Sequence, residues 1–392
     1  MTAPRGKKYI AAADFLRVFA VGLVACFHIW QQSWLDPGFR VLGLRVDLQR
    51  IIRRGYMGVD LMLLLSGFLL YLPVARAARR GEPMPSVRDF YARRLRRIVP
   101  SYLAAILIAL GFTFVYGPDW GSAPRALDLL AHLTFTHTFW RGTYIWTSLN
   151  VGLWTLAVEM QFYLLFPWIA RRFRESPWLT FCVMTAAGLL CRLTIARLDD
   201  VTMLFNQLPC MLDLYALGML SAHFLSIREE KGGHWLSVPG AAACLAGILW
   251  VLWIQNTRDN RDLNQWQMIW RFPLGALGAG FLFCGGLWPK WLDRAAGNPL
   301  TKYCAAISYN FYIWHQYLAV KLKQWNLPAY VTEMPQRDEG RAWQGRYTLL
   351  CFVVAFAAAT LFTYLLEKPA ARWLAGPENN RFAAARRERS KL

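Results

Sequence analysis

Charged residues, and acidic ones above all, are scarce in this chain of 392 residues. Asp, Glu, Lys and Arg make up 17% of it, against about 25% in an ordinary soluble domain. Only 24 residues are acidic, so the 44 Lys and Arg residues leave a net charge of +20. Apolar residues reach 56%, which excludes a disordered chain. Long apolar runs also argue against a basic nucleic-acid-binding protein, so we expect no nucleic-acid partner.

Cysteine clusters and internal repeats are missing as well. No CxxC pair and no Cys/His spacing typical of a zinc site is present, so we expect neither a disulfide framework nor a bound metal. The cysteines stand singly, at Cys26, Cys182, Cys191, Cys210, Cys244, Cys284, Cys304 and Cys351. The lack of a repeat counts against a secondary transporter, because those folds usually contain one.

Long apolar stretches are what the sequence does contain. Ten of them have about 20 residues each, enough to cross a hydrocarbon core of about 30 Å. They lie near 9–31, 56–76, 97–116, 152–170, 178–197, 205–226, 236–254, 267–288, 303–322 and 347–367. The stretch 126–140 is shorter and more polar and predicts a re-entrant or interfacial helix. The predicted fold is therefore all-α, a polytopic protein of about ten transmembrane helices embedded in a lipid bilayer.

Lys and Arg in the connections set the predicted orientation, since cytoplasmic loops are enriched in them. The Arg-rich connection 76–97 indicates that both termini are in the cytoplasm, with the chain integral to the cytoplasmic membrane. Residues 1–375 then form the membrane domain, and 376–392 a basic, disordered tail near anionic lipid. The external loop 32–55 is an exception with five arginines, and either an amphipathic surface helix or a cradle for an acidic acceptor would explain it.

Ionisable residues inside the first apolar stretch are costly, on the order of 2.5–3.5 kcal/mol each at a helix centre. Arg17 and His28 are separated by eleven residues, about three helical turns and about 16 Å along the axis, so they share a helix face. A cation near the inner side and an imidazole near the outer side would suit a transmembrane reaction. The alternatives are a snorkelling Arg17 paired with Asp14 and a hydrogen-bonded core histidine.

Other stretches carry further candidate groups. Arg94 and Arg97 enter the third stretch, where they either anchor the helix or bind phosphates through their forked guanidinium groups. A carboxylate, Glu159, lies among aromatic residues and needs a cation or a proton. The small pair Ser66 and Gly67 permits close approach of a helix or a ligand. Residues with a possible helix-bridging or site-lining role are Asp60, Tyr309, Tyr312 and His315.

Taken in order, these stretches resemble the acyltransferase-3 family of membrane acyltransferases from about residue 10 to residue 370. The matching segments are DFLRVFAVGLVACFH (an Arg-x10-His first helix), GVDLMLLLSGFLL, RRLRRIVP (Arg-x-x-Arg), LWTLAVEMQFYLLFP, ISYNFYIWH and LLEKP. The sequence departs from the family pattern at Met62-Leu63, where a Phe pair is usual, and at Thr155, where Ser is usual. Neither departure removes a proposed reactive group.

The resemblance implies O-acylation, commonly O-acetylation, of a carbohydrate or another hydroxyl-bearing acceptor. It implies no permanently bound cofactor, with acetyl-CoA or another acyl-CoA as co-substrate. Under this hypothesis Arg94 and Arg97 bind the CoA phosphates. Arg17, next to Asp14, lines the path of the donor towards the thioester position.

The resemblance also suggests roles for three residues around the thioester. His28 is the general base, because an imidazole pKa near 6.5 suits proton transfer around neutrality. Glu159 orients the site, and Ser66 donates a hydrogen bond to the thioester oxygen. The acceptor and the acyl group stay open, as do two other functions: a polytopic transporter of an anionic solute and a structural partner in polysaccharide assembly.

Overall fold

The computed structural model describes residues 9–41, 44–116, 125–198, 200–231, 263–285 and 290–375. The predicted span 236–254 and the predicted tail 376–392 lie outside these described residues. The chain forms two compact units. Unit 1 comprises Met1–Met84 and Val158–Ser308, and unit 2 comprises Pro85–Ala157 and Tyr309–Leu392.

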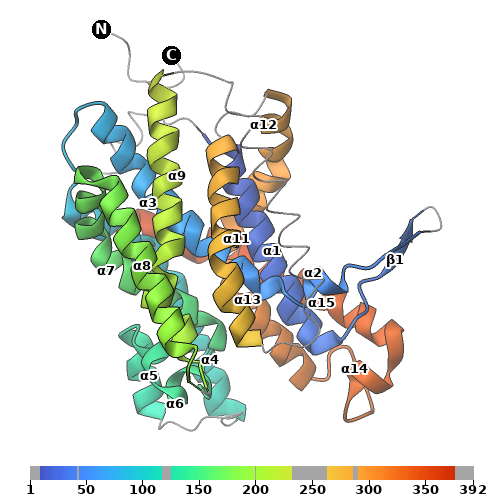
Figure 1. Cartoon of the computed structure of the whole chain (residues 1–392). Coiled ribbons are helices and arrows are strands. Elements are labelled where there is room, and N and C mark those ends of the chain that lie inside the picture. Colours follow the sequence, from blue (N-terminus) through green and yellow to red (C-terminus); the bar gives the residue numbers. More distant parts are fainter. Residues whose placement is uncertain are drawn as a thin grey trace. The chain divides into compact units, whose positions relative to one another are not determined.

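Unit 1 contains the long helices α1, α3, α8, α9 and α11 together with short ones (Figure 1). Helix α9 packs against α3, α8 and α11, and α1 packs against α3. The bounds are α1 (Ala11–Ser33), α2 (Gln49–Ile52), η1 (Gly55–Met57), α3 (Gly58–Arg79), α7 (Trp154–Glu175, in unit 1 from Val158), α8 (Pro177–Ile195), η4 (Leu204–Asn206), η5 (Leu208–Met211), α9 (Leu212–Lys231), α11 (Leu263–Gly285) and α12 (Lys290–Ala296).

A small hairpin interrupts the helices of unit 1. Strands β1 (Phe39–Val41) and β2 (Leu44–Val46) pair antiparallel, with Arg40 opposite Arg45. The hairpin and the short α2 occupy the Arg-rich loop 32–55, where an amphipathic surface helix was one of the two expectations. In the same loop Arg53 stacks on Trp30 of α1, with 4.9 Å from its guanidinium carbon to the ring centroid.

Unit 2 combines long helices with several short ones. Its long helices are α4, α13 and α15, and short helices fill the stretch 125–153. The bounds are α4 (Val87–Tyr116), α5 (Arg125–Leu133), η2 (His137–Phe139), α6 (Arg141–Tyr144), η3 (Val151–Leu153), α13 (Pro299–Gln324, in unit 2 from Tyr309), α14 (Pro335–Asp338), α15 (Gly340–Leu361), the π-helical turn η6 (Phe362–Glu367) and α16 (Lys368–Trp373).

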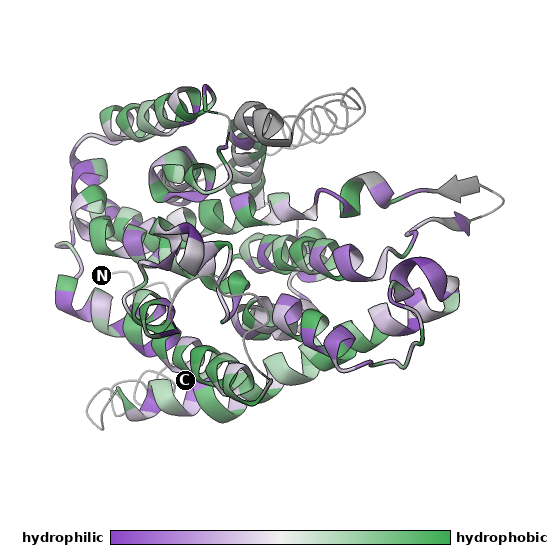
Figure 2. Cartoon of the chain, turned by 90° about the horizontal axis from the view of Figure 1, so that it is seen from below, coloured by the Kyte–Doolittle hydropathy of each residue, from purple (hydrophilic) through white to green (hydrophobic). Residues whose placement is uncertain are grey.

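The all-α polytopic fold is confirmed, apart from the six-residue hairpin. Within the described residues, seven helical stretches are long and apolar enough to cross a membrane, and apolar residues dominate the long helices in Figure 2. Of the other three predicted spans, 236–254 is not described, and 267–288 appears as the shorter apolar helix Arg271–Gly285. The stretch 303–322 forms the polar-rich α13. The number ten therefore stays a prediction.

Glycines bring the central helices of unit 1 together. A Cβ atom added at Gly67 of α3 would overlap the backbone of Tyr215 in α9, and one at Gly218 would overlap the carbonyl of Leu64. Gly58 packs in the same way against Ala20 of α1. Small residues at such crossings allow backbones to approach closely, which is how helices associate in lipid. The close approach that the Ser66-Gly67 pair predicts is thus made by helix α9.

Candidate active site

Helix α1 carries the first two candidates, and the structure pairs them. Arg17 Nη1 lies 3.8 Å from Asp14 Oδ1, one helical turn away, and both side chains are about a fifth to a quarter exposed (21% and 24%). Asp14 also accepts a hydrogen bond of 2.9 Å from the hydroxyl of Tyr9. The Asp14 carboxylate therefore offsets the positive charge of Arg17 and restricts the motion of its side chain, which stays partly exposed.

His28 lies eleven residues further along α1 and is half-buried. Its Nδ1 is 2.9 Å from Oε1 of Gln31, one turn ahead. An amide oxygen only accepts hydrogen bonds, so this contact suits the neutral tautomer that carries its proton on Nδ1 and has Nε2 as the basic nitrogen. The ring also packs against Phe27, with 5.0 Å between centroids. This tautomer is the one that a general base acting through Nε2 requires.

Ser66 of α3 and Glu159 of α7 meet within unit 1. The Ser66 hydroxyl donates a hydrogen bond to Glu159 Oε1, and both residues are half-buried. The two positions are 93 residues apart in the chain, so no local pattern could have paired them. The predicted role of Ser66 as donor to a thioester oxygen stays a prediction, since in this structure its hydroxyl donates to the carboxylate.

Tyr215 of α9 is a neighbour of this pair that the sequence did not single out. Its ring stacks on Phe162 of α7, with centroids 3.7 Å apart and planes 16° apart. The side chain is fully buried, and Glu159 lies close enough to interact electrostatically with its hydroxyl. Gly67 of α3 packs against the backbone of Tyr215 itself, so the crossing that joins the two helices also places an aromatic hydroxyl near Glu159.

Arg94 and Arg97 belong to unit 2, on α4. They are three residues apart and so share one helix face. Arg97 is exposed and Arg94 is half-buried, with the Arg94 guanidinium 5.8 Å from the ring centroid of Phe90. An exposed guanidinium beside one restrained by an aromatic ring is an arrangement that can bind a phosphate group.

Glu367, from the LLEKP segment, faces Arg97 within electrostatic range. It ends the π-helical turn η6 and accepts a hydrogen bond of 2.7 Å from Asn310 Nδ2 of α13, which also donates to Thr363 Oγ1 at 2.9 Å. Turns of this kind are often found at functional sites. The sequence motif identified this carboxylate but gave no partner for it, because Asn310 and Arg97 lie far away in the chain.

The three α13 candidates differ in their contacts. Tyr309 bridges helices, since its hydroxyl donates to the carbonyl of Ile98 in α4 at 2.9 Å. His315 is buried, and its Nδ1 lies 2.7 Å from the carbonyl oxygen of Tyr312 in its own helix. Tyr312 is buried against the same ring, 5.5 Å away. These contacts fit packing and helix bridging.

Asp60 is part of a buried charge network in unit 1. Arg271 Nε of α11 lies 3.1 Å from Asp60 Oδ1, so Asp60 bridges α3 and α11. Nearby, Arg192 of α8 binds Asp213 of α9 through two bonds of 2.8 and 2.6 Å. The carbonyl of Cys210 accepts from both arginines, at 2.7 Å from Arg192 and 3.5 Å from Arg271. The partner of Asp60 could not be predicted from the sequence, because Arg271 lies on a helix far away in the chain.

A second buried polar cluster fills the short helices of unit 2. Asp128 accepts hydrogen bonds from the Thr147 hydroxyl (2.8 Å) and the Ser148 amide (3.0 Å), and its Oδ1 is 3.1 Å from His132 Nδ1. The rings of His132 and His137 stack with centroids 4.0 Å apart. Burial, followed by the neighbouring His132, lowers the pKa of His137 well below its ordinary value. The predicted re-entrant stretch 126–140 is thus a set of short helices around one carboxylate.

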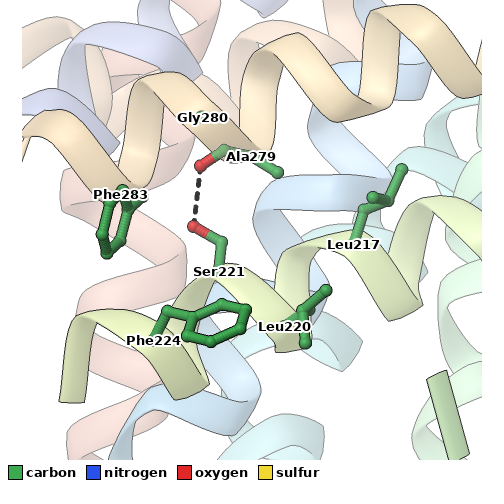
Figure 3. Close-up of a pocket in the computed structure, with 7 residues that line it drawn as sticks. All are labelled: Leu217, Leu220, Ser221, Phe224, Ala279, Gly280 and Phe283. Carbon is green, nitrogen blue, oxygen red and sulfur yellow. Dashed lines mark hydrogen bonds between the residues drawn. The ribbon is translucent and has the colours of Figure 1, made fainter. Parts of the chain in front are cut away.

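A pocket of about 190 Å³ lies between α9 and α11 (Figure 3). Its lining is apolar apart from Ser221, whose hydroxyl donates to the carbonyl of Ala279 at 2.8 Å and so uses its proton within the protein. The pocket contains none of the predicted site residues. Such a lining suits contact with lipid and has no group for acyl transfer.

The described helices and polar groups define a polytopic helical membrane protein with half-buried imidazole, carboxylate and guanidinium groups. A comparison with protein families matches residues 10–368 to a family described as "Acyltransferase domain". The chain therefore belongs to the acyltransferase-3 family, as the sequence motifs predicted. No solved structure matches the chain.

Curated relatives match smaller parts of the chain. O-acetyltransferase OatA of Staphylococcus aureus (strain NCTC 8325 / PS 47) is 30% identical over 179 residues, 43% of this chain and 25% of the relative. Peptidoglycan O-acetyltransferase OatA of Listeria monocytogenes serovar 1/2a is 24% identical over 200 residues, 48% of this chain and 29% of the relative. The matched part thus spans about a quarter of the length of these relatives.

Proposed function

We propose that this protein is a membrane O-acyltransferase that transfers an acetyl group from cytoplasmic acetyl-CoA to a hydroxyl of a glycan acceptor at the outer face. Family membership and the names of the relatives support the reaction class. The observation that carries the proposal is the half-buried His28, whose Nδ1 lies 2.9 Å from Gln31 Oε1, a contact that suits the tautomer with a basic Nε2. Another acyl-CoA is an equally acceptable donor in this proposal. Because the donor is cytoplasmic and the acceptor lies at the outer face, the chain must cross the cytoplasmic membrane.

The reaction follows from general-base chemistry. His28 Nε2 takes the proton of the acceptor hydroxyl while that oxygen attacks the carbonyl carbon of the thioester. The carbon–sulfur bond then breaks, the ester forms, and the CoA sulfur leaves as a thiol with the proton from His28. Base assistance of this kind is worth about 10²–10⁴-fold in rate.

Glu159, Ser66 and Arg17 have supporting roles in the proposal. The Ser66–Glu159 hydrogen bond fixes a carboxylate among aromatic rings, where it can orient the acceptor or the imidazole. Arg17 is restrained by Asp14 and supplies positive charge along the donor's path. All of these residues belong to unit 1.

Donor binding is proposed for residues of unit 2. Arg94 and Arg97 bind the CoA phosphates, and Glu367 together with Asn310 holds Arg97 in place.

Charge reversal in Arg94→Glu plus Arg97→Glu should raise the KM for acetyl-CoA at least tenfold, roughly 1.4 kcal/mol, with a smaller effect on kcat. Steady-state kinetics at several donor concentrations measure this, and Arg88→Glu, an exposed residue on the same helix, is the control. An unchanged KM in the double variant would remove these arginines from the donor site.

Acetyl-CoA carrying a radiolabel on the acetyl carbon tests the proposed function itself. Purified protein in lipid vesicles should release CoA thiol and transfer the label to added glycan or, slowly, to water. A transporter of anionic solutes would leave the thioester intact, so label that stays on CoA would contradict an enzyme.

Mass spectrometry of envelope glycans from cells with and without the protein then identifies the acceptor by the acetyl groups that disappear.

A further inference from the structure

Two cysteines that are distant in the sequence meet at one end of helix α8. Cys191 lies in the last turns of α8 and Cys210 in η5, just before α9, and their sulfur atoms are 2.8 Å apart. Both are free thiols in this structure, Cys191 half-buried and Cys210 buried. A disulfide bond is about 2.05 Å long, so bond formation requires the sulfurs to move by less than 1 Å.

The surrounding contacts hold the two segments together without help from the thiols. Arg192, the residue after Cys191, donates to the carbonyl of Cys210 at 2.7 Å and binds Asp213, three residues after Cys210. The cysteines also pack in an apolar cluster with Ile195, Val201 and Phe205. The sulfurs are therefore brought together by the fold itself.

The predicted orientation places this pair on the oxidising side of the membrane. The Arg-rich connection 171–177 precedes α8 and is expected in the cytoplasm, so the chain reaches the outer side at the end of α8. Disulfides form and persist in secreted and periplasmic environments and are rare in the cytosol.

We propose that Cys191 and Cys210 form a disulfide in the mature protein, joining α8 to the segment that leads into α9. The oxidant is a thiol–disulfide oxidoreductase of the outer compartment with a reactive disulfide. The thiolate of Cys191, the more accessible of the two, attacks one sulfur of that disulfide and displaces the other. Cys210 then attacks Cys191 Sγ and releases the oxidant as a dithiol, so the cysteine pair loses two electrons and two protons to it.

The bond would act on the charge network beside it. The carbonyl of Cys210 accepts hydrogen bonds from Arg192 and Arg271, whose carboxylate partners are on α9 and α3. A covalent link at Cys210 fixes this carbonyl relative to α8. We therefore expect the disulfide to raise the thermal stability of unit 1, and reduction to lower it.

Thiol counting on the unfolded, full-length protein tests the proposal. Membranes are quenched in acid, and the protein is denatured and treated with a maleimide that adds a visible mass per thiol. With eight cysteines in the chain, the wild type should show six reactive thiols before reduction and eight after. Cys191→Ser and Cys210→Ser should each show seven in both conditions.

Cys182→Ser is the matched control, since Cys182 is an exposed cysteine on the same helix. Cys182→Ser should show five reactive thiols before reduction and seven after. A reductant should lower the melting temperature of the wild type and of Cys182→Ser. It should leave the melting temperature of Cys191→Ser unchanged. Peptide mass spectrometry should find Cys191 linked to Cys210. Eight reactive thiols in unreduced wild-type protein, or a link between other cysteines, would overturn the proposal.

Discussion

The two units keep polar groups away from lipid in different ways. In unit 1 the fully buried charges pair across helices: Asp60 with Arg271, and Arg192 with Asp213. In unit 2 the buried carboxylate of Asp128 is satisfied by hydroxyl and amide groups of a nearby loop. Both units leave their candidate reactive groups less deeply buried: His28, Ser66 and Glu159 in unit 1, and Arg94 and Arg97 in unit 2.

This difference in burial separates structural groups from chemical ones. A group with all its hydrogen bonds made inside the protein has little left to offer a substrate, and removing its partner costs folding free energy. A half-buried group keeps access to a ligand while its neighbours restrict its motion. Changes to the buried pairs should therefore act on stability, and changes to the half-buried groups on activity.

The largest effect on stability is expected for Arg192→Leu. Breaking a buried ion pair leaves Asp213 with an uncompensated charge, which typically costs about 3–5 kcal/mol in the free energy of unfolding. Denaturant titration of purified protein in mixed micelles measures the loss. The double variant Arg192→Leu plus Asp213→Leu should recover part of it.

Arg171→Leu is the control for that variant, since Arg171 and its partner Glu175 are 73% and 46% exposed. Its effect should stay within about 0.5 kcal/mol. A stable Arg192→Leu protein that has lost catalysis would break the comparison, because the buried pair would then belong to the reactive site.

A smaller effect, on rate, is expected for Ser66→Ala. Hydrogen bonds to a charged group are worth about 1.5–3 kcal/mol, and each 1.36 kcal/mol in the barrier is tenfold in rate. The acyl-transfer rate should therefore fall roughly 10- to 100-fold while the melting temperature changes little. Ser221→Ala removes a hydroxyl that bonds a backbone carbonyl instead, and it should keep the rate; equal rate losses in both variants would contradict a specific role for Ser66.

The sequence predicted the elements well and the partners poorly. Apolar runs located the described spanning helices, because length and hydropathy are local properties. Ionisable residues within them marked Asp60 and Glu159 as noteworthy. Their partners, Arg271 and Ser66, come from other helices, and only the three-dimensional packing through glycines such as Gly67 decides which residues meet.

Unit 2 shows a further limit of the sequence. The stretch 126–140 stood out as too polar to cross a membrane, and two of its polar residues, Asp128 and His132, pair with each other. Nothing in the local pattern indicated that Thr147 and Ser148 would satisfy the carboxylate. The electrostatic interaction of Arg97 with Glu367 was hidden for the same reason, although both residues stood in quoted motifs.

The smallest expected effect is a pH dependence from unit 2. Folding lowers the pKa of His137 below its unfolded value near 6.5 because burial and His132 disfavour the charged ring. As the pH falls below 6.5 the unfolded state binds the proton first, so stability decreases, by up to about 1.4 kcal/mol per pH unit.

Thermal melts between pH 7.5 and 5 test this pH dependence. The slope should be steeper for the wild type than for His137→Phe, which keeps a flat ring beside His132 but has no proton to bind. Identical slopes in the two proteins would show that His137 does not contribute.

The central claim, that the half-buried His28 is the base for acyl transfer, is tested most directly by one comparison. Wild-type protein, His28→Ala and the control His223→Ala, which changes another half-buried histidine of a spanning helix, are assayed with labelled acetyl-CoA in the same vesicles, with melting temperatures measured in parallel. We predict a transfer rate lower by about 10²–10⁴-fold for His28→Ala alone, with unchanged melting. Transfer by His28→Ala at the wild-type rate would contradict the account.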